Sequence, residues 1–199
     1  MGFEFEVKFA AAEEKQDAIR NALSGVWKSV AMETTYYDTS AGELSALHYT
    51  LRCRLENGEA VCTVKTPAGI LGRGEWEVRC KSIEEAIPKL CKLGAPEQLA
   101  TITRNGIIAI CGAQFTRQVC TVVTDDGTAE LALDRGILFA GGRQLPLCEV
   151  EVELKTGLKE STAAYAEDLA KRYGLQPEPK SKFQRALALR EERENGTAE

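Results

Sequence analysis

The sequence predicts an α+β fold in which a curved antiparallel sheet encloses a charged interior and helices cover the outside. Two segments carry this prediction. Glu4-Phe5-Glu6-Val7-Lys8-Phe9 places charged side chains on one face and apolar ones on the other, because side chains alternate along a strand. The same pattern returns as Glu149-Val150-Glu151-Val152-Glu153-Leu154-Lys155. Helices need an apolar sheet face to pack on, so the charged faces are expected to line the inside.

Size and composition indicate one domain over residues 1–199, with the last six residues frayed. The net charge of -5 argues against a general nucleic-acid binder, and no apolar run is long enough to span a membrane. The seven cysteines are odd in number and form no CxxC motif, which favours buried free thiols in a reducing compartment. The sequence therefore predicts a cytoplasmic protein, as a monomer or homodimer, that binds neither membrane nor nucleic acid.

The first part of the chain reads mainly as strands. Gly25 ends the first expected helix, and Asn57-Gly58 is a tight-turn dipeptide that joins two strands as a hairpin. The expected elements are a strand at 3–9, a helix at 11–24, a short strand at 36–39, and strands at 49–55, 60–66 and 74–80.

The second part begins with a helix. Ser82-Ile83-Glu84-Glu85 is a capping box, and Gly94 follows the helix that it starts. Asp126-Gly127 and Gly141-Gly142 are turn signals between later strands. The expected elements are a helix at 83–93, strands at 101–110, 114–124, 128–134, 137–140 and 147–155, and helices at 159–173 and from Ser181 to about 193.

The charged faces of these strands form one large set. A plain polar face toward water explains any single strand, since antiparallel sheets often have one. That explanation weakens over many strands, and a closed barrel would also remove exposed strand edges. The inward set is Glu4, Glu6, Lys8, Arg52, Arg54, Lys65, Glu75, Glu77, Arg79, Arg117, Glu130, Asp134, Glu149, Glu151, Glu153 and Lys155.

Enclosed charges must be paired, metal-bound or matched to a charged ligand. Clustered carboxylates suit hard cations such as Mg²⁺ or Mn²⁺, and clustered Arg and Lys suit phosphate oxygens. Both together predict a polyphosphate substrate that carries a divalent metal.

An ordered series of motifs resembles the CYTH family, also called triphosphate tunnel metalloenzymes. Glu4-x-Glu6-x-Lys8 resembles the family's ExExK signature, and further matches follow in the family's order over roughly residues 1 to 190. They are Tyr36-Tyr37-Asp38-Thr39, Leu51-Arg52-Cys53-Arg54, Thr63-Val64-Lys65, Arg73-Gly74-Glu75-Trp76-Glu77, Phe115-Thr116-Arg117, Glu130-Leu131-Ala132-Leu133-Asp134, Glu149-x-Glu151-x-Glu153 and Lys180-Ser181-Lys182.

The resemblance implies an eight-stranded antiparallel barrel whose tunnel binds triphosphate and a divalent metal. The bacterial inorganic triphosphatases are the branch that the motifs match best, which implies hydrolysis of triphosphate to diphosphate and phosphate. Many members of that branch carry a second, helical CHAD domain, which is not expected here. Thiamine triphosphatase, class IV adenylate cyclase and a non-catalytic polyphosphate-binding module are the alternatives.

The resemblance also implies roles for individual residues. Glu4, Glu6, Lys8 and Lys65 are the expected catalytic residues. The expected phosphate ligands are Lys8, Arg52, Arg54, Lys65, Arg117 and Lys182, and the expected metal ligands are Glu4, Glu6, Glu149, Glu151 and Glu153. Supporting roles are expected for Glu75, Glu77, Arg79, Glu130 and Asp134. For Lys182, a solvated helix face is the equal alternative.

Overall fold

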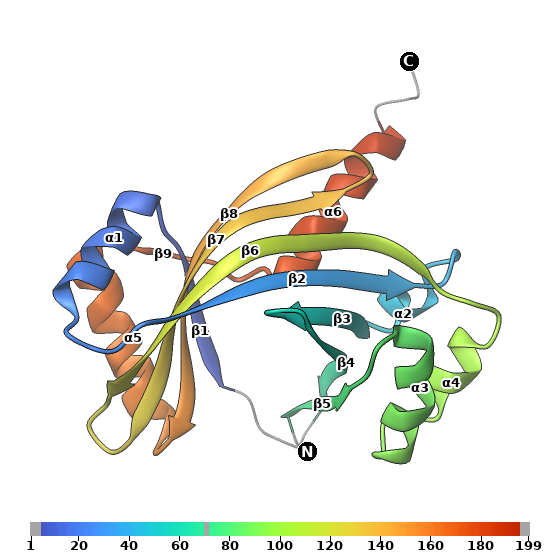
Figure 1. Ribbon diagram of the computed structural model, residues 1–199, viewed down its shortest axis with the longest axis horizontal. Coiled ribbons are helices and arrows are strands. Elements are labelled where there is room, and N and C mark those ends of the chain that lie inside the picture. Colours follow the sequence, from blue (N-terminus) through green and yellow to red (C-terminus); the bar gives the residue numbers. More distant parts are fainter. Residues whose placement is uncertain (1–4, 70–71, 196–199) are drawn as a thin grey trace.

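The computed structural model describes residues 5–69 and 72–195 and shows one long, strongly curved sheet with helices around it (Figure 1). Expected metal ligand Glu4 lies outside the described residues. The strands are β1 (Glu6–Ala10), β2 (Lys28–Asp38), β3 (Thr50–Glu56), β4 (Glu59–Gly69), β5 (Gly72–Arg79), β6 (Ile108–Val123), β7 (Thr128–Ala140), β8 (Arg143–Thr156) and β9 (Gln176–Pro177). The helices are α1 (Glu13–Ala22), α2 (Glu43–Ala46), α3 (Ile83–Lys92), α4 (Gln98–Thr103), α5 (Lys159–Tyr173) and α6 (Lys182–Asn195).

All strand pairs are antiparallel, and the sheet order is β5-β4-β3-β2-β6-β7-β8-β1-β9. β1, from the start of the chain, pairs with β8 near its end and places Glu6 opposite Glu153. Each strand is hydrogen-bonded to its neighbours in this order. Within the described ranges no hydrogen-bonded ladder joins the edge strand β5 to β1 or β9 at the other end of the order. The predicted α+β antiparallel fold is confirmed, with a two-residue ninth strand added to the eight expected.

Most helices cover the outer face of the sheet. α1 and α5 contribute Ile19, Ala166 and Leu169 to an apolar cluster with β6, β7, β8 and β1. α2, α3 and α4 cover β3 and β4 in a second cluster that includes Leu90 and Leu99. None of the described helices is long and apolar enough to cross a membrane.

The last helix, α6, lies on the inner face instead. Its residues Phe183, Ala186 and Leu189 pack with Met32 of β2 and Phe115 of β6, side chains whose strand faces also line the charged interior. Figure 1 shows α6 crossing behind β6, β7 and β8. The expectation that every helix packs outside therefore fails for α6. The reason is that the far ends of these strands turn apolar residues inward, and α6 buries its apolar side there.

Several element boundaries differ from the prediction. The segment from 101 to 110 was expected as a strand, and Thr101-Ile102-Thr103 is rich in β-branched residues, which favour strands. Residues 101–103 belong to α4 instead, because burying Leu99 and Thr103 against the α3 cluster outweighs that local preference. A loop follows, and residues 108–110 form the start of strand β6 as expected. β2 runs over 28–38 rather than 36–39, and residues 128–140 form one strand, β7, rather than two.

Candidate active site

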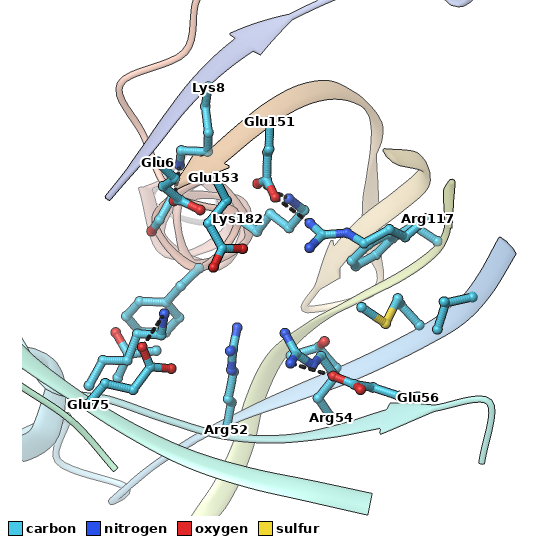
Figure 2. Close-up of a pocket in the computed structure, with 18 of the residues that line it drawn as sticks. Glu6, Lys8, Arg52, Arg54, Glu56, Glu75, Arg117, Glu151, Glu153 and Lys182 are labelled. Atoms are coloured by element: carbon cyan, nitrogen blue, oxygen red, sulfur yellow. Dashed lines mark hydrogen bonds and ion pairs between the residues drawn. The ribbon is translucent and has the colours of Figure 1, made fainter. Parts of the chain in front are cut away.

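A cavity of about 770 Å³ opens on the concave face of the sheet and is lined mainly by charged side chains (Figure 2). Strands from both ends of the sheet order contribute to it, from β5 at one edge to β1 near the other. The charged lining residues are Glu6, Lys8, Arg52, Arg54, Glu56, Lys65, Glu75, Glu77, Arg117, Glu130, Glu151, Glu153, Lys155 and Lys182.

One wall of the cavity is basic and comes from β3 and β4. Arg52 and Arg54 share the inner face of β3 because they are two residues apart, and Lys65 enters from β4. Arg54 pairs with Glu56, and the Lys65 ammonium lies 3.2 Å from Glu75. Burial lowers the pKa of Arg54, and the charge of neighbouring Arg52 lowers it further. Two crowded cations of this kind favour an anion between them.

Among the described residues, Arg52 is the cation of this wall that has no carboxylate partner. Within the described part of the chain it forms no ion pair, and its buried Nε has no hydrogen-bond partner. Tyr36, opposite it on β2, shares a hydrogen bond with its side chain. In Figure 2 Arg52 points into the open space of the cavity with Glu153 and Lys182 across from it. The guanidinium is therefore available to a phosphate group.

The facing wall is acidic and comes from β1, β8 and β7. Glu6 lies opposite Glu153, and Glu153 lies opposite Glu130, so three carboxylates form a row across three neighbouring strands. The Lys155 ammonium lies 2.8 Å from Glu153 and 3.8 Å from Glu130, and Lys8 lies 4.0 Å from Glu6. Carboxylates that line a hydrated cavity in this way fit a hard divalent cation, which prefers oxygen ligands.

A second acidic group lies deeper and is already neutralised. Oxygens of Asp134, Glu149 and Glu151 lie within 4.8 Å of one another, a spacing that suits a metal ion. The Lys182 ammonium sits among them, 2.8 Å from Asp134, 2.7 Å from Glu151 and in contact with Glu149. Arg117 adds a two-pronged pair to Asp134 at 2.8 and 2.7 Å and also binds Glu151.

Arg185, one turn after Lys182 on α6, binds Glu149 and so adds a third cation to this group. We call these six residues the charge cluster. Because its acids and bases balance, the cluster has no excess negative charge for a metal. Glu149 and Glu151 bind cations of α6 here, so their expected role as metal ligands stays a prediction. Glu6 and Glu153 are among the carboxylates outside this cluster that line the cavity.

The charges of the cluster shift the pKa values of its members. Burial alone would raise the pKa of Glu151, but Lys182 and Arg117 outweigh it and hold that pKa well below 4.5. Burial would lower the pKa of Lys182, but Glu151, Asp134 and Glu149 outweigh it and raise that pKa well above 10.5. Both groups are therefore charged over the whole neutral range.

These shifts predict a pH dependence of stability. A depressed carboxyl pKa stabilises the fold above the unfolded value of 4.5, and this contribution is lost as pH falls through the folded value. We expect the free energy of unfolding, from urea titrations at pH 3 to 7, to fall below about pH 4.5. Glu151→Gln should flatten this dependence, whereas Glu59→Gln, at an exposed ion pair, should leave it unchanged. Equal slopes for all three proteins would contradict the assignment.

The N-terminus of α6 completes the cavity. Ser181 accepts a hydrogen bond from the Gln184 backbone at 3.1 Å, and Gln184 accepts one from the Ser181 backbone at 2.8 Å. This box fixes Lys182 and Phe183 at the cavity, where the Phe183 ring lies 5.0 Å from that of Tyr36. Sequence reasoning gave no role to Tyr36, Phe183 or Arg185. The available signals were the place of Tyr36 in a matched motif and the spacing of Lys182 and Arg185 on one helix face.

The structure brings together most of the predicted site residues. All predicted phosphate ligands line the cavity, although Arg117 and Lys182 are bound to carboxylates there. Glu75, Glu77 and Glu130 also line it, whereas Asp134 and Glu149 are fully buried behind it. Arg79 does not belong to the site: its side chain is 80% exposed and pairs with Glu59. Arg79 has the same place in the alternation of β5 as the inward-facing Glu75 and Glu77, but it lies beyond the end of the cavity.

Comparisons with known proteins agree with this geometry. The model of the CYTH domain matches residues 2–187. An inorganic triphosphatase of Haemophilus influenzae is 27% identical over 146 residues, which are 71% of this chain and 41% of that protein. The chain thus spans less than half the length of this relative.

Two solved structures show the same fold. HpAC1 from Hippeastrum, named as an adenylyl cyclase and described as having a dominant triphosphatase activity, has a TM-score of 0.66 and 21% identity, covering 94% of this chain and 97% of its own. PH1819 from Pyrococcus horikoshii has a TM-score of 0.62 and 22% identity, covering 94% of this chain and 100% of its own. With the family model matched over nearly the whole sequence, and the charged cavity on the inner face of its sheet, the chain belongs to the CYTH domain family.

Proposed function

We propose that this protein is a metal-dependent hydrolase that cleaves inorganic triphosphate to diphosphate and phosphate inside the cavity. The observation that carries the proposal is the division of one cavity into a basic wall and a facing acidic wall. Arg52, Arg54 and Lys65 offer charge to phosphate oxygens, and Glu6 and Glu153 offer oxygens to a cation. The triphosphatase among its relatives supports the same reaction.

Different residues of the cavity would have different roles in the reaction. Arg52 and Arg54 would bind and orient the phosphate chain, since their two guanidinium groups project from the same strand face. Lys65, held by Glu75, would keep a positive charge near the oxygens that become more negative as the bond breaks. Glu6 and Glu153 would hold Mg²⁺ or Mn²⁺, which when bound supplies charge neutralisation and lowers the pKa of water.

The cavity lining also indicates whether water or a side chain attacks the phosphorus. It contains neither His nor Cys among the described residues, so it offers no usual side chain for a covalent phosphoenzyme. Direct attack of water on a terminal phosphorus is therefore the simpler reaction, with catalysis by positioning and charge stabilisation.

An organic triphosphate is the second candidate substrate, and one observation favours it. Val30, Met32, Phe115 and Val119 form an apolar strip within the same cavity, which inorganic triphosphate would not need. An aromatic group attached to the phosphate chain, as in ATP or thiamine triphosphate, could lie against it.

A phosphate-release assay on inorganic triphosphate, thiamine triphosphate and ATP, with and without Mg²⁺ or Mn²⁺, decides between these substrates. We expect inorganic triphosphate to give the highest kcat/KM and the rate to depend on metal. Formation of cyclic AMP and diphosphate from ATP would assign the chain to adenylate cyclases. Triphosphate binding without any phosphate release would assign it to non-catalytic binding modules.

The role of Arg52 gives a direct test of phosphate binding. Arg52→Ala should lower kcat/KM for triphosphate by roughly tenfold to over a hundredfold, since a charge-assisted contact contributes about 1.5–3 kcal/mol. Its melting temperature should change little, because Arg52 forms no ion pair with another described residue. Arg79→Ala is the matched control on the exposed end of β5 and should retain full activity. If Arg52→Ala instead lowers the melting temperature strongly while its folded fraction keeps the full kcat/KM, Arg52 is structural.

A further inference from the structure

Two cysteines face each other directly behind the basic wall. Cys53 lies between Arg52 and Arg54 in β3, and its partner across the β3–β4 ladder is Cys62. All seven cysteines are free thiols, and along the ladders of the described residues no other cysteine faces a cysteine. The pair lies on the outer face of the sheet, where Cys62 is fully buried under α3 and Cys53 is half-buried.

The hairpin turn sets the geometry of this pair. Asn57 and Gly58 have φ values of 50° and 88°, which identifies a two-residue turn closed by Glu56 and Glu59. Hydrogen-bonded and non-hydrogen-bonded pairs alternate from such a turn, so Cys53 and Cys62 form a non-hydrogen-bonded pair. Cα atoms of such pairs are about 4.5 Å apart, within the range of roughly 4.4–6.8 Å found in disulfides.

The two thiols also influence each other. The Cys62 thiol donates to the backbone oxygens of Cys80 and Ser82, both at 3.7 Å, and burial followed by the neighbouring Cys53 thiol raises the pKa of Cys62. The Cys80 thiol contacts α3 instead: its Sγ accepts a hydrogen bond from Lys89 at 3.2 Å and donates one to Glu85 at 3.5 Å. Cys53 and Cys62 are therefore the pair that is placed to react together.

We propose that Cys53 and Cys62 form a reversible cross-strand disulfide that weakens triphosphate handling at the basic wall. Formation of the bond is independent of the proposed function, whereas its effect on turnover rests on that function. Arg52, Cys53 and Arg54 are consecutive in β3, and their side chains alternate between its two faces. A displacement of the Cys53 backbone by the disulfide therefore also shifts the backbone of both arginines. Cross-strand Cβ atoms lie about 4.5–5.5 Å apart, and a disulfide draws them to about 3.8 Å.

The oxidation balances with hydrogen peroxide as the oxidant. The sulfur of half-buried Cys53 attacks one peroxide oxygen, the O–O bond breaks, and the products are Cys53 sulfenic acid and one water. The sulfur of Cys62 then attacks the Cys53 sulfur, the S–S bond forms and the S–O bond breaks. The hydroxyl group leaves with the Cys62 proton as a second water. The two thiols lose two electrons in total and the peroxide gains them, and an added dithiol reverses the change.

The bond can be mapped without reference to activity. Cleavage after glutamate separates the cysteines into the peptides 44–56 and 60–75, because Glu43, Glu56, Glu59 and Glu75 flank them. After peroxide treatment and alkylation of the remaining thiols, mass spectrometry should find these two peptides linked. Treatment with dithiothreitol should separate them again.

Turnover is measured on the same samples. We expect oxidation to lower kcat/KM for triphosphate by roughly tenfold or more, since displacement of a positioned group by about 1 Å can cost a hundredfold. Dithiothreitol should restore the rate. Cys53→Ala and Cys62→Ala should each abolish the response to peroxide, and Cys80→Ala should keep it.

Each adverse outcome is distinct. Absence of the linked peptides would overturn the proposal, as would linked peptides with unchanged kcat/KM. If the reduced protein releases no phosphate from triphosphate, the proposed function fails. The disulfide proposal is then judged by the rise in melting temperature that triphosphate produces. That rise should be smaller for the oxidised protein, and an equal rise would overturn the proposal.

Discussion

Replacement of Lys182 by methionine is expected to destabilise the fold by about 3–5 kcal/mol, because it leaves buried carboxylates without their cation. The Lys182 ammonium binds Asp134, Glu149 and Glu151, and the first two of these are fully buried. Methionine keeps the length and packing of the side chain, so the loss reports charge rather than volume. At about 2–4 °C per kcal/mol for a chain of this size, the melting temperature should fall by roughly 6–20 °C.

Two further measurements separate this explanation from simple loss of packing. Without Lys182, Glu151 loses the cation that most lowers its pKa and takes up a proton more readily, so the difference from the natural protein should be smaller at pH 5 than at pH 8. Adding Glu149→Gln to Lys182→Met should recover part of the stability. Lys155→Met is the control, because Lys155 is 40% exposed and its pairs with Glu130 and Glu153 are expected to contribute about 1 kcal/mol or less. Equal melting temperatures for the two lysine variants would refute a special role for Lys182.

Replacement of Glu6 or Glu153 by glutamine is expected to lower turnover of triphosphate by roughly a hundredfold or more, the usual size of losing one electrostatic contact to a reacting group. The two carboxylates lie opposite each other on β1 and β8 and face the cavity. Glutamine keeps their shape but removes a negative oxygen that a divalent cation prefers. Stability should be retained or slightly increased, since the change relieves repulsion among neighbouring acids.

The measurement is phosphate release as a function of Mg²⁺ and of Mn²⁺ concentration, with metal binding followed separately by calorimetry. Both variants should bind metal more weakly and release phosphate more slowly at every metal concentration. Glu59→Gln, on the exposed turn of the β3–β4 hairpin, is the matched control and should behave as the natural protein. Near-normal rates of Glu6→Gln and Glu153→Gln at saturating metal would exclude a direct role in metal binding.

Alternation along single strands was enough to predict much of this protein. The period of two is a property of the extended backbone, so Glu6, Arg52 and Glu153 could be placed on the inner face from their own segments. The match with the structure extends to the outer face, where Val150 and Val152 pack under α1 and α5. The antiparallel fold and the lining of the cavity followed from these local patterns and from the order of motifs.

Position along the sheet was not predictable in the same way. Alternation along β5 places Arg79 on the same face as Glu75 and Glu77, which line the cavity. Arg79 nevertheless lies beyond the cavity and forms an exposed ion pair with Glu59. Alternation assigns a residue to a face but gives no information on where that face ends. A different limit applied to residues 101–103, where strand-like composition gave way to the packing of α4.

The charge cluster was decided by the tertiary structure alone. The sequence marks Glu149, Glu151 and Lys182 as charged, and it is compatible with a metal at the acids and a phosphate at the lysine. Which of these pairs forms depends on where α6 packs, and that depends on apolar contacts of Ala186 and Leu189 with β2, β6, β7 and β8. Once α6 lies on the inner face, Lys182 reaches three carboxylates and, together with Arg117 and Arg185, balances their charge. Local periodicity comes from the backbone, whereas the partner of a buried charge is set by contacts between segments far apart in the chain.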